Sequence, residues 1–264
     1  MRADPTRRYS PRLLALFGRY VAGYLRRHFT AVRVARDGLP PPISGPTIFY
    51  ANHPAWWDPL VLLLIAGRYW RGYEVYAPID ADALRRYPLL ERFGFFGIQT
   101  DSAAGARDFL RASRTVLATG RGIVALTAQG RFSDVRPRPI TIKGGLALLL
   151  HQLPDARAVP VAIEYPFWNE RLPECLVRFG DSVSAGGRNV ADVQAALGDA
   201  LEQTLDGMAA LAIARDPQAF EPVLASRGGA GWLADLPQQV LARLRGQRFD
   251  PAHGAIRRSG VDAG

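Results

Sequence analysis

The sequence of 264 residues contains one cysteine, Cys175, and one lysine, Lys143, so arginine supplies nearly all of its positive charge. A single cysteine excludes a disulfide framework and is typical of proteins from a reducing compartment. No apolar run approaches the ~18 residues of a membrane-spanning helix. The amino terminus carries several arginines and no sustained apolar segment, unlike a signal peptide. We therefore expect a cytoplasmic protein that is soluble or peripheral to the inner face of the membrane.

The four histidines are scattered without the spacing of metal ligands, so we expect no metal site. A net charge of +9 suits an anionic membrane, an acidic thioester cofactor or nucleic acid. The arginines form no clustered basic run and no recognition motif, which disfavours a nucleic-acid partner. With 48% hydrophobic residues, the chain can bury one substantial core.

Residues 52–59, which read Asn-His-Pro-Ala-Trp-Trp-Asp-Pro, separate two apolar segments. The β-branched and aromatic residues before them predict a strand at Thr47–Ala51. The apolar run from residue 60 to residue 66 predicts a buried helix. Asp58 is suited to the N-cap of that helix and Pro59 to its first turn. His53 is thus expected on a turn between strand and helix.

The spacing of His53 and Asp58 allows two interpretations. An imidazole can remove a proton from a hydroxyl while a carboxylate on its other nitrogen fixes the tautomer and stabilises the imidazolium. Alternatively, Asp58 only caps a helix and His53 is an ordinary loop residue. The spacing alone leaves both open.

Strand-like and helix-like segments alternate along the chain, which predicts a single α/β layered domain with a mostly parallel sheet flanked by helices. Besides Thr47–Ala51, strands are expected at Glu74–Ala77, Ile123–Thr127 and Ala158–Ile163, and helices at Ala103–Leu117, after Gly144–Gly145 and at Asn189–Ala214. Residues 10–29 predict an amphipathic helix with Arg12, Arg19 and Arg26 on one side. Such a helix could lie on a headgroup surface or pack on the domain with its arginines in water.

The strand, the Asn-His-x-x-x-x-Asp turn and the apolar helix resemble the first sequence block of the glycerolipid (lysophospholipid) acyltransferase family. Phe93–Asp101 resembles the second block, although Gln99 and Thr100 stand where the family carries a basic residue. Thr127–Ser133 resembles the third, Pro-Glu-Gly-Thr-Arg-Ser, with Ala128, Gln129 and Phe132 replacing Pro, Glu and Arg. Ala158–Ile163 resembles the fourth, a Val-Pro-Val strand. The resemblance covers about residues 40–180.

The third block and the segment after it supply the expected substrate-binding residues. Gly130 follows a strand and could leave backbone N–H groups free to face an oxyanion or phosphate. Gln129 keeps hydrogen-bonding capacity without charge, and Arg131 could bind an anion or be a solvated surface residue. Lys143 lies at a predicted helix start, where an anion would be favoured. Tyr165, Phe167 and Trp168 could line an acyl channel or belong to the core.

The resemblance implies an O-acyltransferase in which His53 is the general base, Asp58 orients it, and a lipid hydroxyl attacks an acyl thioester. It implies acyl-CoA or acyl-carrier protein as co-substrate and no bound cofactor or metal. The loss of basic character in the second and third blocks points to a hydroxylated or glycosylated lipid acceptor rather than simple lysophosphatidate. A non-catalytic lipid-binding relative is the alternative.

The expected organisation has three parts. Residues 1–39 are expected to form an amphipathic helical segment, residues 40–214 the acyltransferase domain, and residues 215–264 a tail that is partly helical or disordered, with a candidate helix from Pro237 to Arg245. Contact with a membrane surface could involve the first or the last of these parts.

Overall fold

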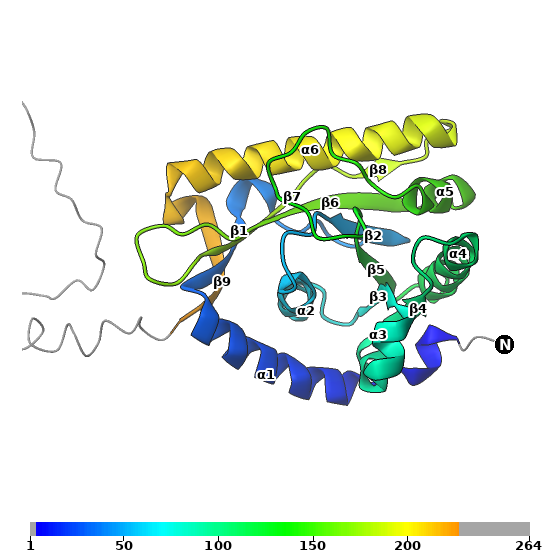
Figure 1. The fold of residues 1–264 in the computed structure, drawn as a ribbon, viewed down its shortest axis with the longest axis horizontal. Helices are drawn as coiled ribbons and strands as arrows, with labels where there is room; N and C mark the ends of the chain where they lie inside the picture. The colour runs from blue at the N-terminus through cyan, green and yellow to red at the C-terminus, as the bar shows by residue number, and fades with distance from the viewer. Residues whose placement is uncertain (1–3, 227–264) are drawn as a thin grey trace, which may run out of the picture.

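The computed structural model describes residues 4–226, and within them nine strands form one sheet (Figure 1). The strand order is β4-β3-β5-β2-β6-β7-β1-β9, and the short β8 pairs with β6. The first five strands in this order, from β4 to β6, are parallel to one another. β6 and β7 pair antiparallel, as do β1 and β9. The strands are β1 (Ala31–Ala35), β2 (Thr47–Ala51), β3 (Glu74–Asp80), β4 (Phe95–Ile98), β5 (Gly122–Thr127), β6 (Arg157–Glu164), β7 (Cys175–Phe179), β8 (Val183–Ser184) and β9 (Phe220–Ala225).

Helices cover both faces of the sheet. In Figure 1, α4, α5 and α6 lie on one side of the strands and α1 and α2 on the other. The α-helices are α1 (Pro11–His28), α2 (Asp58–Tyr69), α3 (Ala81–Arg86), α4 (Ala103–Leu117), α5 (Gly145–Gln152) and α6 (Val190–Ala214). Short 3₁₀ helices are η1 (Pro5–Arg8), η2 (Arg36–Gly38), η3 (Pro88–Phe93) and η4 (Pro217–Ala219). None of these helices is long and apolar enough to cross a bilayer.

The central strand β2 contributes to two hydrophobic cores. Its five residues are all buried, and because successive side chains of a strand point to opposite faces, they divide between the layers. Ile48 and Tyr50 belong to the core beneath α4, α5 and α6, whereas Phe49 and Ala51 belong to the core beneath α1 and α2. The strand that leads into His53 is therefore held from both sides.

The predicted α/β fold with a mostly parallel sheet is confirmed, and each predicted strand and helix within residues 4–226 is present. The structure adds strands that the sequence analysis did not expect, including β1 before residue 40 and β9 after residue 214, which pair with each other at the edge of the sheet. The candidate helix from Pro237 to Arg245 lies outside the described residues.

The start of α2 differs from the expectation by one residue. Trp57 already has helical backbone angles and is the N-cap residue, so Asp58 is the first residue of the helix. The expectation that Asp58 is the N-cap is therefore wrong. The physical reason is that both oxygens of its carboxylate bind His53, Ala55 and Tyr165, which all lie outside the helix, so neither oxygen caps it.

Candidate active site

The candidate site lies where three neighbouring parallel strands end. β2 pairs with β5 on one side and with β6 on the other, both in parallel, so their carboxyl ends meet at one edge of the sheet. His53 follows β2, Ala128–Gly130 follows β5, and Tyr165 follows β6. Open α/β sheets bind their ligands at this edge.

The backbone at His53 is held by residues from both neighbouring strands. Asn52 is buried, and its side-chain amide donates to the carbonyl of Ile163 at 2.9 Å and accepts from the N–H of Ile163 at 2.8 Å. The N–H of His53 donates to Oε1 of Gln129 at 3.1 Å. The His53 carbonyl accepts from the N–H of Ser133 at 2.9 Å. These bonds fix the direction in which the imidazole leaves the sheet.

The side chains of His53 and Asp58 are in contact. Nδ1 of His53 lies 2.6 Å from Oδ2 of Asp58, and the Asp58 side chain is completely buried. A carboxylate at Nδ1 accepts the proton of that nitrogen, so the neutral imidazole carries its lone pair on Nε2. The imidazole side chain retains 17% exposure, so the ring is not sealed from solvent. The pair thus has the arrangement of an oriented general base.

Two further groups hold the Asp58 carboxylate. The hydroxyl of Tyr165 donates to Oδ1 at 2.6 Å, and the N–H of Ala55 donates to Oδ2 at 3.3 Å. Burial raises the pKa of Tyr165 well above its ordinary value, so the phenol stays protonated and keeps its donor. Burial likewise raises the pKa of the nearby Cys175 thiol, which disfavours the reactive thiolate form.

An aromatic ring covers part of the imidazole. The ring of Phe132 lies 4.3 Å from that of His53, centroid to centroid, with 34° between their planes, and Phe132 is 62% exposed. Phe132 thus places an apolar surface where the resembled family carries arginine.

The remaining predicted residues take different positions around the loop. The side chain of Gln129 is engaged by the His53 backbone. Lys143 forms an ion pair with Asp101, and its stem lies against Gly130, where an added Cβ would come within 2.9 Å of Lys143 Cε. Arg131 is exposed, and its side chain makes no hydrogen bond or ion pair with residues 4–226.

Gly130 contributes no free donor of its own, because its N–H donates to the carbonyl of Thr127 at 3.2 Å. Gly130 has a φ of +65°, which turns the chain sharply after β5. Beyond this turn, the N–H groups of Arg131 and Phe132 make no hydrogen bond within the described part of the chain. These two free donors belong to Phe132, whose ring covers His53, and to the residue before it.

A cavity of about 550 Å³ opens beside the His53 loop, and we call it the Glu164 cavity. The His53 loop contributes Pro54, Ala55 and Trp57 to its lining, and the end of α1 contributes His28 and Phe29. The remaining lining residues come from the segment after β5 and from the end of β6 and the segment after it: Asp134, Val135, Arg136, Glu164, Tyr165, Phe167 and Pro173. Two of the three aromatics expected near the site, Tyr165 and Phe167, line this cavity. Trp168 instead packs against the core and donates to the carbonyl of Ala212 at 3.0 Å.

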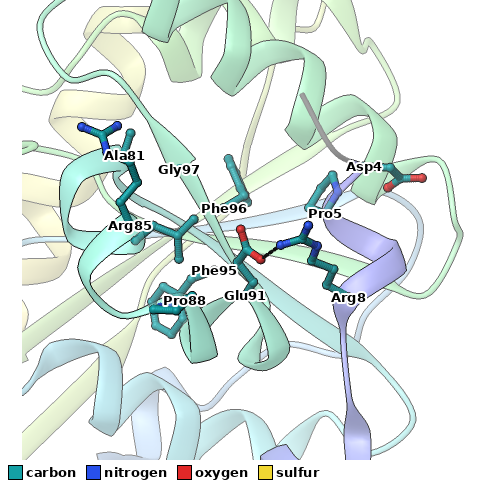
Figure 2. A pocket seen from close by; sticks show the side chains of 11 residues that line it. Asp4, Pro5, Arg8, Ala81, Arg85, Pro88, Glu91, Phe95, Phe96 and Gly97 are labelled. Carbon is teal, nitrogen blue, oxygen red and sulfur yellow. Dashed lines mark hydrogen bonds and ion pairs between the residues drawn. The ribbon is translucent and has the colours of Figure 1, made fainter. Parts of the chain in front are cut away.

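A second cavity, of about 430 Å³, lies elsewhere, and none of the predicted site residues lines it. Figure 2 shows it between the amino-terminal η1, the start of α3 and strand β4, with an ion pair between Arg8 and Glu91. Phe95 and Gly97 of the second sequence block line this cavity rather than the His53 site. Within residues 4–226, no group of three His, Cys, Asp or Glu side chains is placed to hold a metal ion.

Sequence reasoning missed the contributions of Tyr165, Asn52 and Glu164. Tyr165 stands 107 positions from Asp58, so no local spacing connects the two. The only signal was its position directly after a predicted strand, which places a residue near the active edge of a parallel sheet.

No family model matches the sequence, and neither does any curated protein. Among solved structures, the chain is similar to the 1-acyl-sn-glycerophosphate (LPA) acyltransferase PlsC from Thermotoga maritima, with a TM-score of 0.51 and 14% identity. The match covers 76% of this chain and 79% of that chain. The two proteins share a fold. At this level of identity the likeness shows the fold alone.

Proposed function

We propose that this protein is an O-acyltransferase that moves a fatty acyl group from an acyl thioester to a hydroxyl of a lipid. The observation that carries the proposal is the contact between His53 and the fully buried Asp58 at the carboxyl edge of the sheet. The fold shared with an LPA acyltransferase supports it. The donor is acyl-CoA or acyl-carrier protein, and the protein binds no further cofactor.

In the proposed reaction, Nε2 of His53 removes the proton of the acceptor hydroxyl, while Asp58 stabilises the imidazolium that forms. The hydroxyl oxygen attacks the thioester carbonyl carbon, and the carbonyl oxygen becomes an oxyanion. The free N–H groups of Arg131 and Phe132 are the donors that would stabilise it. Collapse of the intermediate breaks the carbon–sulfur bond, and the imidazolium returns its proton to the departing thiolate. An ester and a free thiol result.

The outward face of α1 supports contact with an anionic membrane surface. Leu16 and Tyr20 are each 64% exposed, Arg12, Arg19, Arg26 and Arg27 are also exposed, and α1 contains no acidic residue. The inward residues Val21 and Leu25 are buried. The helix therefore packs on the domain and still presents an apolar and basic face outward, which suits a headgroup region.

The apolar side of this face continues towards the candidate site through aromatic contacts. Tyr20 stacks on Tyr24, and the ring of Tyr24 lies 6.2 Å from that of Trp56 in the His53 loop. Trp56 is itself 53% exposed. We infer that the protein binds the bilayer through α1 with the His53 loop facing the lipid.

The test is thiol release from long-chain acyl-CoA with a total lipid extract as acceptor, followed by mass analysis of new esters. His53→Ala should lose roughly 10²-fold or more of the activity, because a general base contributes ~10²–10⁴-fold. If wild type shows no turnover with acyl-CoA, acyl-carrier protein thioesters are tried next. Binding of lipid without turnover from either donor would favour a non-catalytic lipid-binding protein over the enzyme.

A further inference from the structure

The Glu164 cavity contains a carboxylate without a partner. The side chain of Glu164 makes no hydrogen bond or ion pair with residues 4–226, although it is partly buried. Burial raises the pKa of its carboxyl group, which reflects the incomplete solvation of the charge. A polar group in this position is costly unless a ligand supplies the missing hydrogen bonds. The cavity is therefore suited to a ligand that brings hydrogen-bond donors.

An anionic headgroup fits this cavity poorly. Two of its lining residues, Asp134 and Glu164, are acidic. The only arginine in the lining, Arg136, already binds Asp134 through Nε at 2.8 Å and Nη2 at 2.6 Å. These bonds hold the pKa of Asp134 well below its usual range, so the aspartate stays charged beside Arg136. A phosphate would have to compete with Asp134 for the guanidinium and would approach two carboxylates.

A cationic headgroup could pair with Glu164 but would also meet Arg136, which is close enough to Glu164 to act on it electrostatically. A neutral group that carries several hydroxyls meets no like charge. Its hydroxyls can donate to Glu164 and accept from the guanidinium N–H groups of Arg136 that do not bind Asp134. The mixed charges of the wall therefore suit an uncharged, polyhydroxylated ligand.

Aromatic rings form another part of the wall. Phe29 lies 5.0 Å from Trp57 and 5.5 Å from Tyr165, and Phe167 adds a ring that is 63% exposed. The faces of a sugar ring are built from C–H groups and pack on aromatic rings, while its hydroxyls point outward from the edge to polar groups. A volume of about 550 Å³ lies within the range of small-molecule sites.

We propose that the Glu164 cavity binds the uncharged, hydroxyl-rich headgroup of the acceptor, a glycosyl or related polyol group, with Glu164 accepting hydrogen bonds from its hydroxyls. The position is suitable, because Pro54 and Ala55 of the wall follow His53 directly and Tyr165 of the wall binds Asp58. This inference rests on the proposed acyl transfer for its meaning. Binding to the cavity can nevertheless be measured without turnover.

The experiment measures binding of hexyl glucoside by tryptophan fluorescence and by saturation-transfer NMR, with hexyl phosphate and hexyltrimethylammonium as competitors. Glu164→Gln and Phe167→Ala are each expected to weaken glucoside binding about tenfold, the effect of losing one hydrogen bond to a charged group or one ring contact. Glu170→Gln and Tyr87→Ala are matched controls, since both residues lie outside the cavity lining and Tyr87 is 59% exposed. In parallel, dodecyl glucoside and lysophosphatidate are compared as acceptors with acyl-CoA.

Saturable glucoside binding that weakens in both cavity variants, and in neither control, supports the inference. If that binding occurs but no acceptor is acylated by either donor, the headgroup site stands and the proposed acyl transfer fails. If lysophosphatidate is acylated while glucoside neither binds nor reacts, the acyl transfer stands and the inference is overturned. Displacement of glucoside at lower concentrations of hexyl phosphate or hexyltrimethylammonium would also overturn it.

Discussion

The hydroxyl of Tyr165 donates to Oδ1 of Asp58 at 2.6 Å, while His53 occupies Oδ2 of the same carboxylate at the same distance. Each oxygen therefore has its own partner, and the carboxylate cannot rotate without breaking a short bond. The orientation of the imidazole thus depends on a tyrosine at the end of a different strand.

Tyr165→Phe removes that hydrogen bond and leaves the ring in place. We expect a fall in kcat of about 10–100-fold, because a hydrogen bond to a charged group contributes roughly 1.5–3 kcal/mol. Without the donor, the carboxylate carries more charge towards His53, so the low-pH limb of the rate profile should move to higher pH. A pH profile of initial rates measures both effects. An unchanged profile with lower thermal stability would show that Tyr165 has only a structural role.

Asp58→Asn replaces the carboxylate by an amide that cannot stabilise an imidazolium. We expect a loss of activity on the order of 10³–10⁴-fold, as when a triad carboxylate is neutralised. Asp101→Asn serves as the control, because Asp101 is exposed and pairs with Lys143. Single-turnover rate constants of the two variants are compared with that of the wild type. Near-normal rates for Asp58→Asn would contradict the proposed role of the pair.

Phe132→Arg restores the basic residue of the resembled family beside His53. Because Phe132 is 62% exposed, the change should alter the free energy of unfolding by no more than about 0.5 kcal/mol. The added charge should raise the activity on lysophosphatidate relative to an uncharged acceptor about tenfold, since a charge-assisted hydrogen bond contributes on this scale. Ratios of kcat/KM for the two acceptors measure it. A ratio that does not change would show that Phe132 does not face the acceptor.

Leu16→Glu combined with Tyr20→Glu places two negative charges on the outward face of α1. We expect the affinity for vesicles rich in anionic lipid to fall at least tenfold. Each basic residue near such a surface contributes ~1 kcal/mol to binding, and the new negative charges would be repelled by it. Ile213→Glu is the matched control, because Ile213 is 80% exposed on α6 across the sheet. Flotation with vesicles gives the result. Equal losses in both proteins would argue against docking through α1.

Glu164→Gln should stabilise the protein at neutral pH. Burial raises the pKa of Glu164, so folding favours its protonated form, and the charged form costs stability once the pH exceeds the ordinary value of a carboxyl group. The advantage of the glutamine should disappear in acid, where the carboxyl group is protonated in both the folded and the unfolded protein. Thermal melts at pH 7 and pH 3.5 compare the two proteins. A melting temperature that falls at pH 7 would contradict a desolvated carboxylate.

Much of the fold could be predicted from sequence, because its central elements have strong local patterns. The buried strand before Asn52, the apolar helix α2 and the long α6 are all where their sequence patterns place them, although α2 begins at Asp58 rather than after it. Strands β1 and β9 were missed because each gains its stability from pairing with a segment distant in the chain. Such pairing leaves little local signal.

The candidate site divides in the same way. His53 and Asp58 are five positions apart, so a turn brings them together and the sequence could indicate the pair. Gln129 is a predicted substrate-binding residue, and the structure adds a contact that its sequence position did not indicate, because its side chain accepts from the backbone N–H of His53. Glu164 had no motif to mark it. What sets it apart is its place in the lining of the cavity beside the His53 loop, a property of the folded chain that no sequence pattern expresses.

The buried side chain of Asn52 has a consequence for how the site is built. Its amide bonds both the N–H and the C=O of Ile163, which two successive peptide groups of β2 would otherwise bond if the parallel ladder continued. One of those groups would be the nitrogen of Pro54, which has no hydrogen to donate. The main chain is thereby free to leave the sheet one residue early without leaving the donor and acceptor of β6 unsatisfied. Asn52→Ala would remove both hydrogen bonds between the end of β2 and Ile163 of β6. The backbone position of His53 would then be less firmly fixed.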